Sequence, residues 1–201
     1  MNLIRNNGVQ LVGKFTNTCY YDYNFNTINE LLEHDIDLLI TAVKSYKIEA
    51  LLETVEKYKH KDIFLLCAQY GIDIGQMYTS HFEESQILRM VINFAGNITT
   101  LFRSAPNVCK VTAFNPPNYI ASINDSHHDM AKDIAETLTS TGMKTESVDS
   151  FTLADHVWKK SILITSISPI CGLSKLSISE AMSSTDTAEI VEQTLLESME
   201  V

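Results

Sequence analysis

The chain has 201 residues, of which 45% are hydrophobic and 20% are charged, a composition typical of a globular protein that can bury a sizeable core. Its formal net charge of −10 at pH 7 argues against nucleic acids and anionic membranes as partners, because both require a basic surface. No apolar run reaches the roughly 20 residues that cross a bilayer, and the start of the chain lacks the apolar core of a signal peptide.

The four cysteines are widely separated, with no C-x-x-C pair. This spacing indicates free thiols in a reducing compartment rather than a metal site, so we expect a cytoplasmic protein without a bound metal. The cysteines are Cys19, Cys67, Cys109 and Cys171.

Segments typical of strands and helices alternate over the first 150 residues. Residues 37–43 and 62–68 are continuous apolar runs, which predict strands buried on both faces, and 89–94 and 108–114 are further strand candidates. Between the first two strands, apolar residues at helical spacing predict a helix over 48–58. This alternation predicts a mostly parallel sheet with helices on both faces.

A further helix is expected after residue 125. Asp125 or Ser126 can cap its start, and Gly142 can end it. Its apolar face comprises Met130, Ile134 and Leu138.

The pattern changes to helices alone after about residue 150. Residues 154–168 predict a helix that is apolar nearly all round at 162–167 and therefore buried, and Pro169 should end or kink it. A last amphipathic helix should run from Thr185 to the end of the chain without a stop signal, as a truncated helix would. We therefore expect a Rossmann-type domain over 1–150 and the beginning of a helical domain over 151–201.

Two lysines are candidate site residues. Lys44 directly follows the predicted strand 37–43, at the edge of the sheet where doubly wound folds bind ligands. The alternative is that Lys44 is a solvated residue at the start of a loop. On a helix, Lys160 shares a face with Ile164, Ile167 and Ser168. Partial burial there would lower the pKa of its ammonium toward the range of a proton donor, whereas a lysine that extends to the surface would stay solvated.

Two other patterns favour ordinary structural explanations. His127 and His128 lie among acidic residues, but neighbouring side chains on a helix point about 100° apart, which suits a solvated helix start better than a metal site. The spacing of Gly71 and Gly75 is typical of a turn and a helix entry rather than of a phosphate-binding loop.

Three segments, in order, resemble the ketopantoate reductase family along essentially the whole chain. DLLITAVKSYKIEALL, which begins at Asp37, is similar to the family's D-L-(hydrophobic)-V-K-A-Y-Q segment. CAQYGID, from Cys67, resembles its Q-N-G-L-G turn. HVWKKSILITSISPI, from His156, resembles its W-x-K-L-x-x-N-x-x-x-N-P segment, and the terminal TLLESMEV resembles the middle of a longer family helix.

The resemblance implies an NADPH-dependent reduction of ketopantoate to pantoate, on the route to pantothenate, by a protein whose full-length form could be a homodimer. It makes Lys160 the general acid and a substrate contact, and Lys44 a contact of the cofactor. Gln69, Tyr70, Gly71 and Gly96 would also lie against the cofactor.

Three positions depart from the family pattern. Tyr70 replaces the asparagine of Q-N-G, and Ile164 and Ser168 replace the two asparagines that follow the catalytic lysine. Isoleucine offers no hydrogen bond to a hydroxy-acid substrate, so a relative that acts on another 2-oxo acid fits better than ketopantoate reduction, as does one that has lost activity.

The family's opening strand, its G-x-G-x-x-G loop and its C-terminal helices have no counterpart in the sequence. We therefore expect a fragment that is inactive alone and binds NADPH weakly or not at all. Without the opening strand, residues 37–43 should form an exposed apolar edge of the sheet. The alternative is a non-catalytic binding or scaffold protein that has kept the fold but lost cofactor binding.

Overall fold

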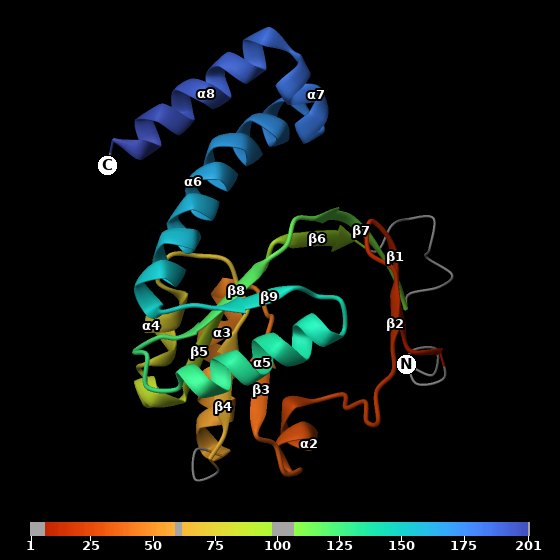
Figure 1. Cartoon of the computed structure of the whole chain (residues 1–201), viewed down its shortest axis with the longest axis vertical. Helices are drawn as coiled ribbons and strands as arrows, with labels where there is room; N and C mark the ends of the chain where they lie inside the picture. Colours follow the sequence, from red (N-terminus) through yellow and green to blue (C-terminus); the bar gives the residue numbers. More distant parts are fainter. Residues whose placement is uncertain (1–6, 59–61, 98–106, 201) are drawn as a thin grey trace.

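The structure is a computed structural model that describes residues 7–58, 62–97 and 107–200. Two sheets and the helices packed on them form the body of the molecule. A long helix, Ser150–Ser174, leads from the body to a helical arm, which consists of the end of this helix and the two helices that follow it (Figure 1). The strands are β1 Val9–Gly13, β2 Asn17–Cys19, β3 Leu38–Thr41, β4 Phe64–Cys67, β5 Ile87–Val91, β6 Phe94–Asn97, β7 Val108–Phe114, β8 Asn118–Ser122 and β9 Thr145–Ser147. The α-helices are α2 Ile28–Leu32, α3 Ile48–Val55, α4 Ile74–Tyr78, α5 His128–Ser140, α6 Ser150–Ser174, α7 Ile178–Ser183 and α8 Thr185–Met199.

The five-stranded sheet contains the predicted buried strands, in the order β3-β4-β5-β8-β9. β3, β4 and β5 are parallel, β8 runs antiparallel to β5, and β9 is parallel to β8. The apolar runs at 37–43 and 62–68 thus form adjacent parallel strands, and together with the helical C-terminal part they confirm the expected Rossmann-type α/β fold.

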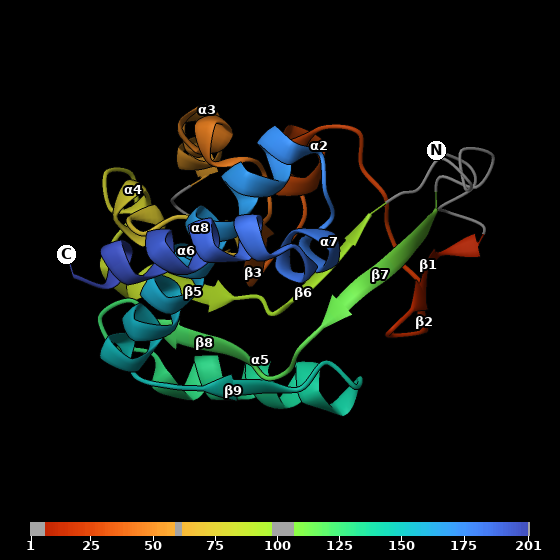
Figure 2. The same ribbon diagram turned by 90° about the horizontal axis from the view of Figure 1, so that it is seen from above.

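Helices cover both faces of this sheet, as the alternating pattern predicts (Figure 2). On one face, α3 and α4 bury residues such as Ile48, Leu52 and Tyr78 against β3 and β4. On the other face, α5 places Ala131 and Ala135 against β4, β5 and β8. The apolar face of each helix therefore accounts for its position on the sheet.

A separate four-stranded sheet has the order β2-β1-β7-β6, which differs from the single sheet expected from the sequence. β7 coincides with the predicted strand at 108–114, and it pairs parallel to β1 and antiparallel to β6. The pairing of β1 with β7 is long-range in sequence, so local patterns carry little information about it, whereas β2 pairs with β1 in a local hairpin.

The long helix α6 is fixed at its first turn by two aspartates. Asp149 caps the helix through its side chain, which accepts a hydrogen bond from the Thr152 amide at 2.8 Å. Asp125 accepts hydrogen bonds at 2.7 Å from both the amide and the hydroxyl of Ser150. The prediction that Asp125 or Ser126 caps α5 is wrong, because α5 begins after His127 with no side-chain cap.

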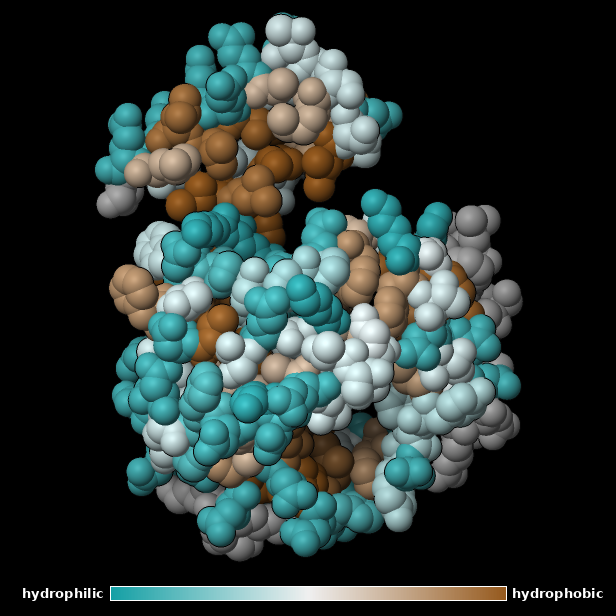
Figure 3. All heavy atoms as spheres, in the orientation of Figure 1, coloured by the Kyte–Doolittle hydropathy of each residue, from teal (hydrophilic) through white to brown (hydrophobic). Residues whose placement is uncertain are grey.

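The second half of α6 corrects two further expectations. The helix continues through Pro169 to Ser174, so the proline does not end it. The predicted burial of 162–167 is incomplete, because Leu163 and Ile164 are 50% and 37% exposed. Here α6 has left the sheets and packs mainly against α7 and α8, and apolar side chains gather over this arm (Figures 1 and 3).

β3 forms one edge of the five-stranded sheet in the described part of the chain, as expected for the 37–43 segment. Its Ile40 side chain is 56% exposed. α6 begins at Ser150, where the sequence suggests a domain boundary, although the division into two domains stays a prediction. Within the described ranges, no helix is long and apolar enough to cross a membrane.

A buried hydroxyl network joins β3, β4 and α4. The Tyr78 hydroxyl lies 2.6 Å from the Thr41 hydroxyl and 3.0 Å from the side-chain nitrogen of Gln69. The Thr41 hydroxyl also donates to the Leu66 carbonyl at 3.2 Å. Burial raises the pKa of Tyr78 to about 12, so the phenol stays protonated and available to the network at neutral pH.

A second polar contact ties α3 and the 3-10 turn after it to the segment that follows α4. The His81 ring nitrogens lie 2.9 Å from a Glu56 carboxylate oxygen and 3.1 Å from one of Glu49. The hydrogen bond with Glu56 is the main cause that raises the pKa of His81. The imidazolium form therefore stabilises this corner of the fold.

We predict that Tyr78→Phe lowers the free energy of unfolding by about 1–3 kcal/mol, because it leaves the buried Gln69 amide without its hydroxyl partner. Urea denaturation followed by circular dichroism measures this change. Tyr46→Phe is the matched control, since Tyr46 is 79% exposed, and we expect no measurable effect from it. Equal effects of the two substitutions would contradict the prediction.

The contribution of His81 to stability should depend on pH. Because its pKa is higher in the folded state than the unfolded value of about 6.5, the contribution is complete below pH 6.5 and is lost as the pH rises through the folded pKa. The difference in unfolding free energy between wild type and His81→Gln should therefore shrink from pH 5.5 to pH 8.5. His128→Gln, at the exposed start of α5, is the control. A His81 difference that stays constant over this range would rule out the ion pairs as its source.

Candidate functional site

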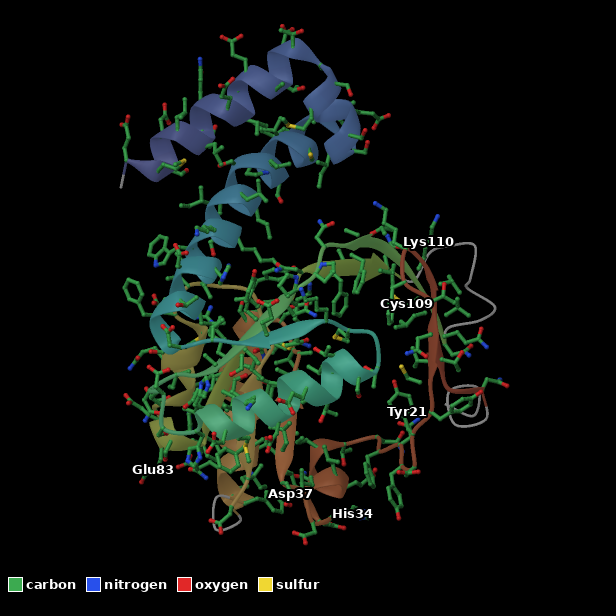
Figure 4. The ribbon with its side chains drawn as sticks, in the orientation of Figure 1. Tyr21, His34, Asp37, Glu83, Cys109 and Lys110 are labelled. Carbon is green, nitrogen blue, oxygen red and sulfur yellow. The ribbon has the colours of Figure 1, made fainter. Side chains whose placement is uncertain are left out.

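The carboxyl ends of β3, β4 and β5 lie together beneath α6. Asp37 and Glu83, which precede β3 and β5, both lie at the opposite, lower end of the sheet in Figure 4. Parallel strands therefore end side by side at the upper edge, where open α/β sheets form their ligand crevices.

A cavity of about 310 Å³ opens at this edge. Its walls come from the segment that follows β4, from β5 and β6, and from one face of α6. The lining residues from α6 are Val157, Lys160 and Ser161. This volume is at the small end of the range of ligand sites in proteins, which is roughly 300–1,000 Å³.

Helical spacing explains why Lys160 lines this cavity. Leu153 and Val157 are buried against Val91 of β5 and Ala121 of β8. Lys160 follows Val157 on the same face of α6, so its side chain extends along the same surface toward the carboxyl edge of the sheet.

Two groups contact the Lys160 ammonium. Its Nζ donates a hydrogen bond to the Ile92 carbonyl, just after β5. It also lies 4.3 Å from the centroid of the Tyr70 ring, within the range of a cation–π contact. An ammonium has three N–H donors, so two stay available to a ligand in the cavity.

The turn after β4 supplies the opposite wall. Gln69 is buried there, and its amide contacts the Tyr78 hydroxyl, so this side chain holds the turn in place. Tyr70 is 56% exposed and covers Lys160. Gly71 has φ of +133°, a conformation that side chains other than glycine rarely adopt.

Gly96 also lines the cavity, from β6. A β-carbon at this position would lie 3.0 Å from both the Cys109 sulfur and the Lys110 carbonyl of β7. Cys109 and Lys110 are residues of β7, which lies between β1 and β6 in the four-stranded sheet (Figure 4). Close pairing of β6 and β7 is therefore sufficient to explain this glycine.

The remaining candidates lie elsewhere. Lys44 follows β3 at the same edge of the sheet, but it is exposed and does not line this cavity. Ile164 lines a neighbouring cavity of about 390 Å³, and the wall shared by the two cavities includes Tyr70 and Lys160. Ser168 is exposed further along α6. The structure thus brings together Gln69, Tyr70, Gly71, Gly96 and Lys160, and leaves Lys44 and Ser168 outside.

The sequence analysis missed the arginine of the cavity wall. Arg89 lies within β5, and its guanidinium donates hydrogen bonds to the Gly71 and Ile72 carbonyls. An arginine inside an otherwise apolar strand, in the sequence ILRMV, is the signal that could have identified it. As for metals, no group of three His, Cys, Asp or Glu side chains suited to an ion occurs among the residues that the structure describes.

We predict that Tyr70 and Lys160 are energetically coupled. In a double-mutant cycle with Tyr70→Leu and Lys160→Met, the coupling energy from urea denaturation should be about 0.5–2 kcal/mol, because each single change removes the cation–π contact. Tyr70→Phe keeps the aromatic ring and should keep the coupling. Lys159→Met is the control partner, because Lys159 instead pairs with Asp155 at 2.5 Å. A coupling of zero for Tyr70 with Lys160 would show that the contact contributes nothing in solution.

Comparison with known protein families gives one match. The family model described as ketopantoate reductase PanE/ApbA covers residues 1–116. These residues include β1 to β7, and with them the parts of the cavity wall that come from the turn after β4, from β5 and from β6. Comparison with curated protein sequences gives no match.

Several solved structures share the fold over nearly the whole chain. A PanE/ApbA family ketopantoate reductase from Ralstonia eutropha superposes with a TM-score of 0.75 at 16% identity, covering 98% of this chain and 61% of that one. A 2-dehydropantoate 2-reductase from Geobacter metallireducens gives 0.74 at 14% identity, with 97% and 62% covered. D-mandelate dehydrogenase in complex with NADH and anilino(oxo)acetate gives 0.70 at 16% identity, with 94% and 58% covered.

Identities this low establish the shared fold alone, and the chain spans about three fifths of the length of these structures. The family match extends over more than half of the chain, and it includes the segments at Asp37 and Cys67 that carry the resemblance in the sequence. The chain therefore belongs to the ketopantoate reductase PanE/ApbA family of oxidoreductases.

Proposed function

We propose that the protein containing this chain reduces a 2-oxo acid with NADPH, and that Lys160 is the general acid. The observation that carries this proposal is the position of the Lys160 ammonium, in the wall of a cavity at the carboxyl edge of a parallel sheet. Membership of an oxidoreductase family supports the reaction type.

The chemistry follows from the donors that Lys160 has available. When bound, a nicotinamide cofactor would supply hydride to the ketone carbon of the substrate. As the carbon–oxygen double bond becomes a single bond, negative charge develops on the oxygen, and the Lys160 ammonium stabilises it by a hydrogen bond. Transfer of a proton from Nζ to that oxygen then completes the alcohol. The Ile92 carbonyl and the Tyr70 ring hold the ammonium in place for this step.

The residues present fit the reacting end of the cofactor and a small substrate. The cavity of about 310 Å³ accommodates a small acid and the ring that faces it, but not a whole dinucleotide. We propose that Gln69, Tyr70, Gly71 and Gly96 contact the nicotinamide end and that Lys44, further along the same sheet edge, contacts a phosphate. Because the similar D-mandelate dehydrogenase structure contains NADH, both coenzymes belong in the test.

The substrate is ketopantoate or a related 2-oxo acid. Most side chains around the cavity are apolar, including Met90, Val91 and Phe94. Ile164, which offers no hydrogen bond, and Ser168 stand where the family has asparagines, and this difference favours an acid with an apolar side chain over one with a hydroxyl. We further propose that residues 151–201 begin a helical domain and that the full-length parent forms a homodimer in the cytoplasm.

A second candidate is a non-catalytic protein that uses the same cavity for binding. The observation in its favour is the Tyr70 ring, which lies against the ammonium where the family has an asparagine. In such a protein Lys160 would hold Tyr70 rather than a substrate.

Steady-state oxidation of NADPH and NADH by the natural protein containing this chain, with ketopantoate and a series of apolar 2-oxo acids, separates the two candidates. The reductase proposal predicts turnover, and a kcat for Lys160→Ala that is lower by about 10²–10⁴-fold. Lys132→Ala removes an exposed charge on α5, outside both cavities, and should change kcat by less than about twofold. No turnover with any acid would support the binding protein instead, whereas turnover that survives Lys160→Ala would refute Lys160 as the general acid.

A further inference from the structure

Arg89 is a charged residue in β5, the middle strand of the five-stranded sheet. It pairs with Cys67 on one side and with Ala121 on the other, in a strand whose other four residues are buried. Its Nη1 donates to the Ile72 carbonyl at 2.6 Å, and its Nη2 donates to the Gly71 carbonyl. Burial lowers the pKa of Arg89, but an arginine stays charged at neutral pH, so a positive charge lies in the cavity wall.

None of the ion pairs found in the described part of the chain includes Arg89, although the Asp73 carboxylate acts on its charge at longer range. Burial raises the pKa of the neighbouring Cys67 thiol to about 12, so that group is neutral. Asp73 and Glu84 line a separate cavity of about 220 Å³, to which Arg89 also contributes. The cavity that contains Lys160 has two cationic side chains and no acidic one in its wall.

The hydrogen bonding of Arg89 is also incomplete. A guanidinium has five N–H donors, and the two carbonyls accept from two of its three nitrogens. The third nitrogen, Nε, is enclosed and has no acceptor among the described residues. Because Nε is enclosed, a ligand in the cavity would be bound through the remaining N–H donors of Nη1 and Nη2.

We propose that Arg89 and Lys160 form an oxyanion-binding site, in which Arg89 binds the carboxylate of a 2-oxo acid while Lys160 faces the ketone oxygen. This inference rests on the proposed function, and it adds the residue that selects an acid over an uncharged ketone. A carboxylate matches the planar fork of a guanidinium, and the apolar walls between the two cations would strengthen both contacts. A cofactor phosphate offers the same chemistry, so the test includes it.

Binding to the purified chain, measured by titration calorimetry, tests the site without requiring turnover. The probes are oxamate, its uncharged counterpart oxamide, and inorganic pyrophosphate. Wild type should bind oxamate in preference to oxamide, and Arg89→Met should weaken oxamate binding by about 10–100-fold while changing oxamide binding little. Lys160→Met should also weaken oxamate binding, whereas Lys132→Met, at an exposed lysine of α5 outside both cavities, is the control and should not.

Arg89→Lys distinguishes the effect of the positive charge from the effect of the hydrogen bonds to the turn. Lysine keeps the charge but cannot bridge two carbonyls as the guanidinium does. It should retain most of the preference for oxamate over oxamide, and it serves if Arg89→Met does not fold. The proposal is overturned if Arg89→Met binds oxamate as wild type does, or if it loses oxamate and oxamide equally, which would indicate a role in the turn alone. Binding of pyrophosphate but not oxamate would also overturn it, in favour of a phosphate site.

The same variants distinguish failure of this site from failure of the reductase proposal. If oxamate binding depends on Arg89 but the natural protein shows no NADPH oxidation, the site stands and the reductase proposal fails. If Lys160→Ala abolishes turnover while Arg89→Met leaves the KM for the 2-oxo acid unchanged, the reductase proposal stands and the role of Arg89 is refuted.

Discussion

The packing of α6 on the ends of β5 and β8 is the contact on which the site depends. Leu153 and Val157 bury their side chains against Val91 and Ala121, and the helical repeat then carries Lys160 over the carboxyl edge of the parallel strands. The parallel register of β3, β4 and β5 brings the turn after β4 to the same edge. Two segments far apart in the sequence thereby form one cavity.

Local pattern was sufficient to predict the elements that are strongly apolar or strongly periodic. The runs at 37–43 and 62–68, the 108–114 strand and the helix from Thr185 all correspond to observed elements, because burial on both faces or on one stripe leaves a clear sequence signal. β2 and β9 are three residues long and largely polar, and β1 pairs with β7 about a hundred residues later. Their formation depends on tertiary partners that no local window contains.

The residues of the candidate site also fall into those that the sequence could indicate and those that it could not. Gln69, Tyr70 and Gly71 were expected at the site because their segment resembles the family's Q-N-G-L-G turn, and Lys160 because its segment resembles the family's lysine segment, and all four line one cavity. Arg89 was overlooked because a single charge does not interrupt a strand pattern. The contact between Tyr70 and Lys160 could not be foreseen, since it depends on how far α6 extends over the sheet. The fully buried helix expected at 162–167 is instead half-exposed, because α6 projects beyond the sheets before α7 and α8 pack on it.

The two aspartate contacts at the start of α6 fix the position of its first turn. A small change of angle there therefore moves residues further along the helix by a larger distance. Asp149 and Asp125 hold the first turn at Ser150, and Lys160 lies about 15 Å further along the axis at the usual rise per residue. A tilt of only about 5° at that first turn would displace the ammonium by roughly 1 Å, a distance that can change the rate of a chemical step by about a hundredfold. Asp125, in the turn before α5, and Asp149, directly before α6, thus influence the position of a side chain in the cavity, and exchange of either aspartate would alter the geometry of the site although neither lines the cavity.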